Sequence, residues 1–410
     1  MRITQVLWRQ HIGRMTKRHW YGASKKFVAP TNTENQLITH GIQVVDAKDV
    51  IAPPKINRPR IEIEQLFSSP PPRDQNHPNW NEKPRLEHLE NNVILDGVKQ
   101  AQILTKTQVH SALPEKLENF HEEISPEVQR LVTRYIYASH IFDAHQSMLP
   151  KKKDPLRPAF VFPRIYGIPD VRKAHNFTQK LLNLCALISD PIVVKQRKIT
   201  ENAQIRTYIE RGNDLLYFET KLDTFVISNK LLTPMSLKND HFDEPLPSIA
   251  PLDPVISFRP ENIYTIEDHY PVSSESTWCN PHTIMITYDS ELVKNITELP
   301  VTNDQIQARS LLKSFATAAC CAKQKFGDDV IDLPEPVTIQ CIQSNGKWFE
   351  FSVFQLNTLD IDNDRGTRNI WWSSPRLELY EIAGYVSGRP TLEKYNPEVF
   401  QKFLAFYKNV

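Results

Sequence analysis

The chain has 410 residues, 40% of them hydrophobic, and a formal net charge of +1, so it is long enough to bury a sizeable core in two or three domains. Its 11 glycines are too widely spaced for a Gly-x-Gly-x-x-Gly fingerprint, a Walker loop or a Gly-x-Ser-x-Gly elbow. This spacing excludes the common nucleotide-binding and hydrolase classes that depend on those motifs. The five cysteines form no Cys-x-x-Cys pair, which is typical of reduced thiols inside a cell.

The N-terminal segment is basic. The first 33 residues contain seven Lys or Arg and no acidic side chain, and apolar residues such as Leu7 and Trp8 lie among them. This pattern is typical of a mitochondrial transit peptide, which we expect over 1–29, although a basic tail that binds nucleic acid has the same charge. The prolines of 30–91 predict an extended arm that becomes ordered only against a partner. No apolar run reaches the length of a membrane span.

Helices are expected over 92–190. Ile94, Val98, Ala101 and Leu104 recur at helical spacing in a first helix that Pro114 ends. A second helix begins after Ser125 with Pro126 in its first turn. A third carries its apolar stripe from Val171 to Ile188.

The period changes in 191–410, where strands are expected. Four short strands are predicted at 192–199, 204–210, 215–221 and 224–228, with a tight turn over 211–214, and a further strand at 282–288. A long helix is predicted at 303–326, followed by strands at 337–343 and 348–356 around Asn345-Gly346. Asn396 and Pro397 open a final helix. The elements come in blocks, so the fold class is α+β (mixed α/β): a helical region, then a mixed or antiparallel sheet with packed helices, preceded by the arm.

The segment 349–372 runs from a dense apolar strand into a loop with Asp360, Asp362 and Asp364. An EF-hand would need glycine at the sixth position and glutamate at the twelfth, but counting from Asp360 these are Arg365 and Trp371. We therefore expect no metal and interpret the aspartates as turn caps. The 13 histidines show no zinc-binding spacing, so no cofactor, no catalytic residue and no small-molecule substrate is predicted.

The charges are unevenly distributed. Residues 151–198 carry eleven Lys or Arg against three Asp, whereas 240–298 carries eleven acidic residues against two basic ones. A basic block of this kind fits phosphate contacts, and an ordinary solvated face, or one that docks on the chain's own acidic block, is the alternative. The candidate RNA contacts are Lys151, Lys152, Lys153, Arg157, Arg164, Arg172, Lys173, Lys195, Arg197 and Lys198.

Three segments carry a family resemblance: Leu95–Lys116, Val353–Thr358 with its acidic continuation, and Glu398–Tyr407. In this order they resemble the mitochondrion-specific ribosomal family that comprises large-subunit protein thirty-seven and its paralogue, small-subunit protein thirty or programmed cell death protein nine. The resemblance covers about a quarter of the chain. It implies a non-enzymatic constituent of the large subunit in the mitochondrial matrix, in contact with large-subunit rRNA and neighbouring ribosomal proteins, and paired with its paralogue as a heterodimer.

The expected organisation is therefore a transit peptide (1–29), a proline-rich arm (30–91), a helical region (92–190) and an α/β region with a C-terminal helix (191–410). The alternatives are the paralogous ribosomal protein, or a matrix enzyme or RNA-processing factor whose site has no recognised motif. A deep pocket with a strongly perturbed acid or base would favour the enzyme.

Overall fold

The computed structural model describes residues 16–22, 32–46, 50, 74–80, 84–88, 90–151, 156–157, 159, 162–163, 165–237, 245–262, 267–297, 299–362 and 364–410. The chain divides into two units, 1–71 and 72–410, and each is described by itself. In the first, residues 16–22 and α2 (Thr33–Thr39) are helical, and α2 has no buried residue. Most of the expected transit peptide and arm lies outside the described residues, and the predicted boundaries at 29, 91 and 190 stay predictions.

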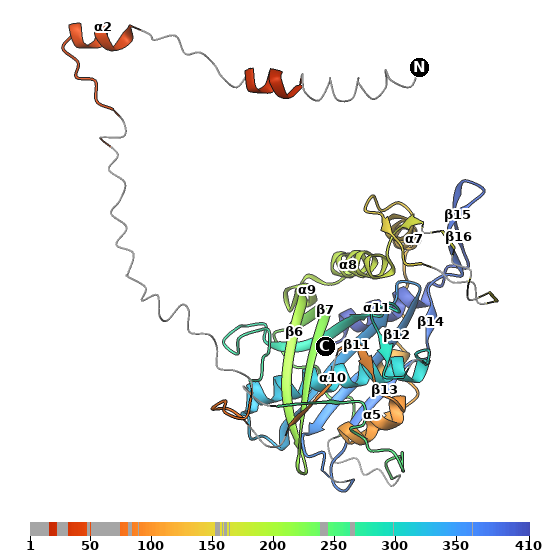
Figure 1. Cartoon of the computed structure of the whole chain (residues 1–410). Coiled ribbons are helices and arrows are strands. Elements are labelled where there is room, and N and C mark those ends of the chain that lie inside the picture. Colours follow the sequence, from red (N-terminus) through yellow and green to blue (C-terminus); the bar gives the residue numbers. More distant parts are fainter. Residues whose placement is uncertain are drawn as a thin grey trace. The chain divides into compact units, whose positions relative to one another are not determined.

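The second unit is built on a ten-stranded mixed sheet (Figure 1). Its strands are β1 (Arg85–His88), β3 (Thr107–His110), β6 (Arg197–Arg211), β7 (Asp214–Ser228), β8 (Arg259–Glu261), β9 (Asn280–Thr287), β11 (Asp332–Ser344), β12 (Trp348–Thr358), β13 (Asn369–Ser373) and β14 (Leu377–Glu378). The order is β3-β13-β12-β11-β9-β7-β1-β8, with β6 beside β7 and β14 beside β12. The pairs β3–β13, β9–β11 and β1–β7 are parallel and the others antiparallel.

Helices cover both faces of this sheet. They are α5 (Gly97–Thr105), α6 (Glu115–Glu118), α7 (Pro126–His140), α8 (Asp170–Ile188), α9 (Pro191–Lys195), α10 (Asn303–Phe326) and α11 (Glu398–Lys408). One core lies under α5 and α10, and a second under α7, α8 and α11. The strand β12 serves both, because Phe354 and Leu356 enter the first core while Phe351 and Val353 enter the second. This alternation is what a strand buried on both faces requires.

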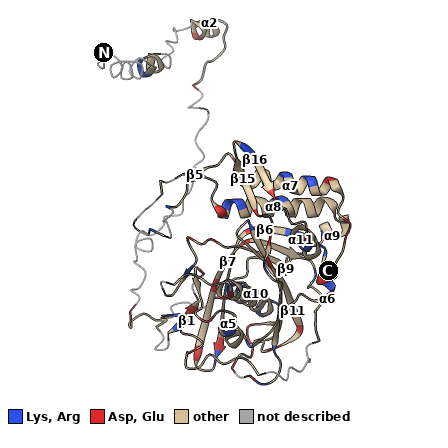
Figure 2. Ribbon diagram, turned by 90° about the vertical axis from the view of Figure 1, so that its right-hand side faces the viewer, with Lys and Arg blue, Asp and Glu red and all other residues tan. Residues whose placement is uncertain are grey.

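Three small two-stranded sheets complete the unit. They pair β2 (Asn92–Val93) with β10 (Lys294–Asn295), β4 (Ser147–Met148) with β5 (Tyr166–Gly167), and β15 (Ile382–Val386) with β16 (Arg389–Glu393). Figures 1 and 2 both show β15–β16 projecting at the end of the unit beyond α7.

The predicted α/β fold class is confirmed, and several elements have the predicted limits. The long helix α10 spans Asn303–Phe326 and begins with a capping box between Thr302 and Gln305. The Asn345-Gly346 turn joins β11 to β12, and the Asn345 side chain accepts hydrogen bonds from the backbone amides of Lys347 and Trp348, at 2.9 and 3.0 Å. The second and third helices are α7 and α8, and Asn396 accepts from the Glu398 amide at the start of α11.

Two predicted elements are wrong in detail. The first helix does not continue to Pro114, because Lys106 adopts a left-handed conformation (φ 47°) and the chain then enters the edge strand β3. The strand expected at 192–199 begins instead as the helix α9, since Asp190 caps it and Pro191 occupies its first turn.

The other short strands predicted at 204–228 are parts of the two long strands β6 and β7. The predicted break coincides with Asn202, whose φ of 52° shifts the alternation of buried residues by one position. In the sequence this shift looks like a gap between two short strands, although the hydrogen bonds between β6 and β7 continue on both sides of Asn202.

Candidate functional site

The basic block predicted from the sequence contains both exposed and covered side chains. Lys151, Arg157, Lys195 and Lys198 are exposed, whereas Lys152, Lys153 and Arg164 lie outside the described residues. Lys173 is partly covered and pairs with Asp170 at 2.8 Å on the first turn of α8. Figure 2 shows Lys and Arg along α8 and at the β15–β16 hairpin. The structure thus places four of the ten predicted residues at exposed positions.

Arg172 and Arg197 make contacts within the chain. The Arg172 guanidinium forms two hydrogen bonds with Asp143, a largely buried carboxylate that also accepts from Asn176 at 2.8 Å. The hydrogen bond from Arg172 lowers the pKa of Asp143. Arg197 donates to the carbonyl of Asn409 at 2.6 Å, and burial lowers its pKa to about 10. These two cations fix the loop after α7 and the C-terminus of the chain.

The aspartates of the loop after β12 also have partners. Asp360 lies 3.4 Å from Lys106 Nζ, and Asp362 accepts from the Gly212 amide at 2.6 Å. They line an open cavity of about 570 Å³ together with Glu210, Asp328, Asp329 and Lys323. Within the described residues no group of three His, Cys, Asp or Glu side chains is arranged to hold a metal ion.

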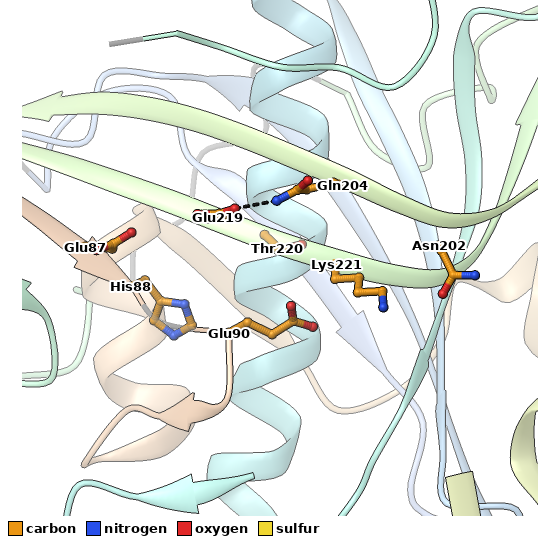
Figure 3. A pocket seen from close by; sticks show the side chains of 8 residues that line it. All are labelled: Glu87, His88, Glu90, Asn202, Gln204, Glu219, Thr220 and Lys221. Carbon is orange, nitrogen blue, oxygen red and sulfur yellow. Dashed lines mark hydrogen bonds between the residues drawn. The ribbon is translucent and has the colours of Figure 1, made fainter. Parts of the chain in front are cut away.

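A second cavity, of about 390 Å³, lies between β1, β6 and β7 (Figure 3). Glu87, His88 and Glu90 come from β1 and the turn that follows, and Lys221 comes from β7. Burial raises the pKa of Glu87 and lowers that of His88 to about 4. His88 packs between the rings of Phe218 and Phe258, with centroids 6.0 and 5.5 Å away.

A buried cation pair from α10 meets this cavity. Lys313 Nζ donates to Glu90 at 2.8 Å and to the Lys221 carbonyl at 2.7 Å. Burial, and then the positive charge of Arg309, lower the pKa of Lys313 to about 8. Arg309 donates to the Thr287 carbonyl at 3.3 Å. The perturbed lysine therefore has acceptors on two elements that it holds against α10, an arrangement that stabilises the layer contact.

Buried thiols and histidines complete the set of perturbed groups. Burial raises the pKa of Cys321 and of Cys341 to about 12, so both thiols are protonated at neutral pH. Burial also lowers the pKa of His140 to about 4 and of His282 to about 3. His282 hydrogen bonds to the Asn409 carbonyl at 2.9 Å, close to the guanidinium of Arg197.

Sequence reasoning missed a buried amide network within the segment 349–372. Gln355 accepts from the amides of Met235 and Ser236 at 2.8 and 3.1 Å and donates to the Ser236 carbonyl at 3.0 Å. Asn369 donates to the carbonyls of Thr105 and Thr358 at 2.9 and 3.0 Å. The signal was the two amides, Gln355 on β12 and Asn369 on the neighbouring strand β13, since buried amides need partners. The network holds the strand to segments distant in sequence, and it is structural.

The sequence is similar to those of mitochondrial ribosomal proteins. Large ribosomal subunit protein mL37 of Gallus gallus is 26% identical over 377 residues, which cover 86% of this chain and 82% of that protein. The mL37 proteins of Rattus norvegicus and Bos taurus are each 24% identical over 77% of this chain and 72% of theirs. Residues 294–410 match the family described as mitochondrial 28S ribosomal protein S30 (PDCD9). These similarities confirm the resemblance inferred from the three segments.

Proposed function

Because this chain is homologous to the mL37 proteins over most of its length, we propose that it is a structural constituent of the large subunit of the mitochondrial ribosome. The observation that carries the proposal is the 26% identity across 86% of the chain. The relatives that match over most of the chain are large-subunit proteins, which favours the large-subunit protein over its paralogue. In this role the chain supports mitochondrial translation in the matrix, after import by a transit peptide over 1–29.

A non-enzymatic role agrees with how the perturbed groups are used. The Lys313 amine is occupied by Glu90 and by a backbone carbonyl. The buried thiols are protonated, and no Cys-x-x-Cys pair is present in the sequence. The buried charges of the described residues thus brace helices against strands, and none is arranged as a nucleophile beside a base.

We further propose that the exposed part of the basic block contacts rRNA phosphates. Lys151, Arg157, Lys195 and Lys198 are exposed and would displace condensed counterions from the backbone. In the sequence, Lys152 and Lys153 complete a lysine triplet with Lys151 and add two further positive charges to this loop. Arg172 and Arg197, which already have partners, would contribute by positioning the loop and the C-terminus.

Protein neighbours form the second part of the proposal. The family includes a paralogue, and we propose that the two form a heterodimer within the large subunit, as homologous subunits commonly pair through related surfaces. The part of the proline-rich arm that precedes β1 would become ordered on a neighbouring protein or rRNA surface. No described helix is long and apolar enough to span a bilayer.

The test is incorporation into the large subunit. A tagged chain in which Lys151–Lys153 and Arg157 are changed to Glu should assemble poorly, whereas the unchanged chain should assemble fully. A matched variant changes four lysines outside the block, Lys99, Lys221, Lys230 and Lys294, to Glu; all four are exposed. Equal assembly of the two variants would remove the basic block from the RNA interface. Failure of the unchanged chain to assemble would refute the ribosomal role itself.

A further inference from the structure

Four aromatic side chains are exposed on a unit whose other described aromatic residues are buried or half-buried. Within the described part of 72–410, the exposed Phe, Tyr and Trp residues are Phe142, Phe162, Tyr166 and Tyr385. Tyr166 is 67% and Tyr385 59% exposed. They come from two segments only, 142–166 and 382–386. Exposed aromatic rings gathered in this way mark an interaction surface, since single exposed apolar residues are normally scattered.

The two segments lie side by side at one end of the unit. The Phe142 ring meets the Tyr385 ring edge-on, with centroids 6.2 Å apart. Tyr166 lies on β5, which Figure 2 labels at the same end of the unit as β15 and β16. We call these four residues the aromatic platform.

The platform is held in place by the fold. Asp143, which follows Phe142, is fixed to α8 through Arg172 and Asn176. The Leu149 amide donates to the Ile165 carbonyl at 2.9 Å, beside the β4–β5 pair. In the β15–β16 hairpin, Ser387 and Gly388 have φ of 51° and 75°, which suits a tight two-residue turn. The rings are thus presented on anchored backbone, so little ordering is needed when a partner binds.

One of the two segments that form the platform is basic in sequence. In sequence, 142–169 carries five Lys or Arg against two Asp, and one of those two is the buried Asp143 that pairs with Arg172. Lys151, Arg157 and Arg389 are exposed. The loop that carries the lysine triplet therefore lies within the same segment as the rings.

We infer that the aromatic platform binds unpaired nucleotides of RNA, whose bases stack on the rings while the adjacent basic loop neutralises their phosphates. Single-stranded RNA is recognised in this way, by aromatic faces combined with a cationic track. The rings alone would also suit a protein partner, because aromatic residues are enriched in protein interfaces, but lysines are depleted from the core of such interfaces, so Lys151–Lys153 favour RNA. The inference deepens the proposed function, on which it rests for the class of partner, by specifying unpaired rather than duplex RNA.

The experiment measures binding of the full chain to a fluorescent single-stranded RNA and to a duplex of the same length. Tyr166→Leu combined with Tyr385→Leu removes two ring faces but keeps apolar side chains, and should lower affinity for the single strand about tenfold or more. Its affinity for the duplex and the salt dependence of binding should not change. Tyr166→Phe with Tyr385→Phe keeps the rings and should bind as the unchanged chain does.

A second pair of substitutions, Lys151→Glu with Arg157→Glu, should weaken binding to both RNAs and reduce the salt dependence. If this charge variant weakens binding but the Leu variant does not, stacking is refuted while the phosphate contact stands. If only the Leu variant weakens binding, the phosphate contact is refuted and stacking stands. If the unchanged chain binds neither RNA, and the platform cross-links to a ribosomal protein instead, the inference is overturned in favour of a protein partner.

Discussion

Acidification should destabilise the described fold through three buried histidines. His88, His140 and His282 have pKa values lowered by burial to about 4, 4 and 3, against 6.5 for an ordinary histidine. A lowered pKa means that the unfolded chain binds more protons, so the stability is fully present above pH 6.5 and is lost as the pH falls toward 4. Each histidine should cost about 2 kcal/mol between pH 7 and pH 5, by proton linkage.

The three together would remove about 6 kcal/mol, comparable with the whole stability of a marginal domain. Other groups change this little within the window. Lys313, with a pKa of about 8, stays protonated in the folded and the unfolded state below pH 7. Burial raises the pKa of Glu350 in the folded state. The folded chain therefore binds this proton more readily than the unfolded chain, so Glu350 adds stability as the pH falls through its raised pKa and opposes the loss caused by the histidines.

The assay is denaturant unfolding of the full chain at pH 7 and pH 5, followed by circular dichroism. His88→Leu keeps the contacts with Phe218 and Phe258 but removes one titrating group, so it should reduce the loss by about a third. His145→Leu, at an exposed position, is the matched control and should leave the loss unchanged. An unfolding free energy that is the same at both pH values would refute the reasoning, as would a loss unaffected by His88→Leu.

Other substitutions test the packing. Gly346→Ala should destabilise by about 1–3 kcal/mol in chemical unfolding, because the new Cβ would lie 3.1 Å from a backbone nitrogen of α8 at φ 91°. Gly366 has φ 84° but open space around the position of a new Cβ, so Gly366→Ala should destabilise less. Equal destabilisation by the two substitutions would show that the close contact at Gly346 contributes nothing. Gln355→Leu should lower the free energy of unfolding by about 2–3 kcal/mol and speed hydrogen exchange at the amides of Met235 and Ser236. Unchanged exchange at these amides would show that Gln355 does not hold this segment. Lys313→Met should lower the free energy of unfolding by about 2–4 kcal/mol, and adding Glu90→Gln should restore part of that stability. If the effects of the two substitutions simply add, Lys313 and Glu90 are not coupled.

Local signals predicted the elements that depend on neighbouring residues. The capping box and apolar stripe of α10, the Asn345-Gly346 turn and the pattern of β12 are all set within a few residues, and the structure has them where predicted. The strand β3 was missed because it is only four residues long and owes its conformation to parallel pairing with β13, more than 250 residues away. The alternation of buried residues shifts near Asn202 in β6 and between Leu222 and Phe225 in β7, so both strands were predicted in pieces.

For the candidate site, the sequence predicts only the excess of basic residues and not which of them are exposed. The excess of Lys and Arg in 151–198 is visible in the sequence, but charge alone cannot distinguish exposed Lys151 from Arg172, which a largely buried aspartate engages. The aromatic platform was missed because Phe142 has the helical spacing of the apolar residues of α7, yet it lies beyond the helix end and is 55% exposed. Tertiary contacts between residues far apart in sequence decide both outcomes.

Sedimentation tests the central claim most directly. A tagged chain expressed in cells, followed through a sucrose gradient of mitochondrial lysate under conditions that separate the subunits, should peak with the large-subunit rRNA. After mild ribonuclease treatment it should shift toward the light fractions together with other large-subunit proteins. A peak that stays in the light fractions of the untreated lysate, or with the small subunit, would contradict the account.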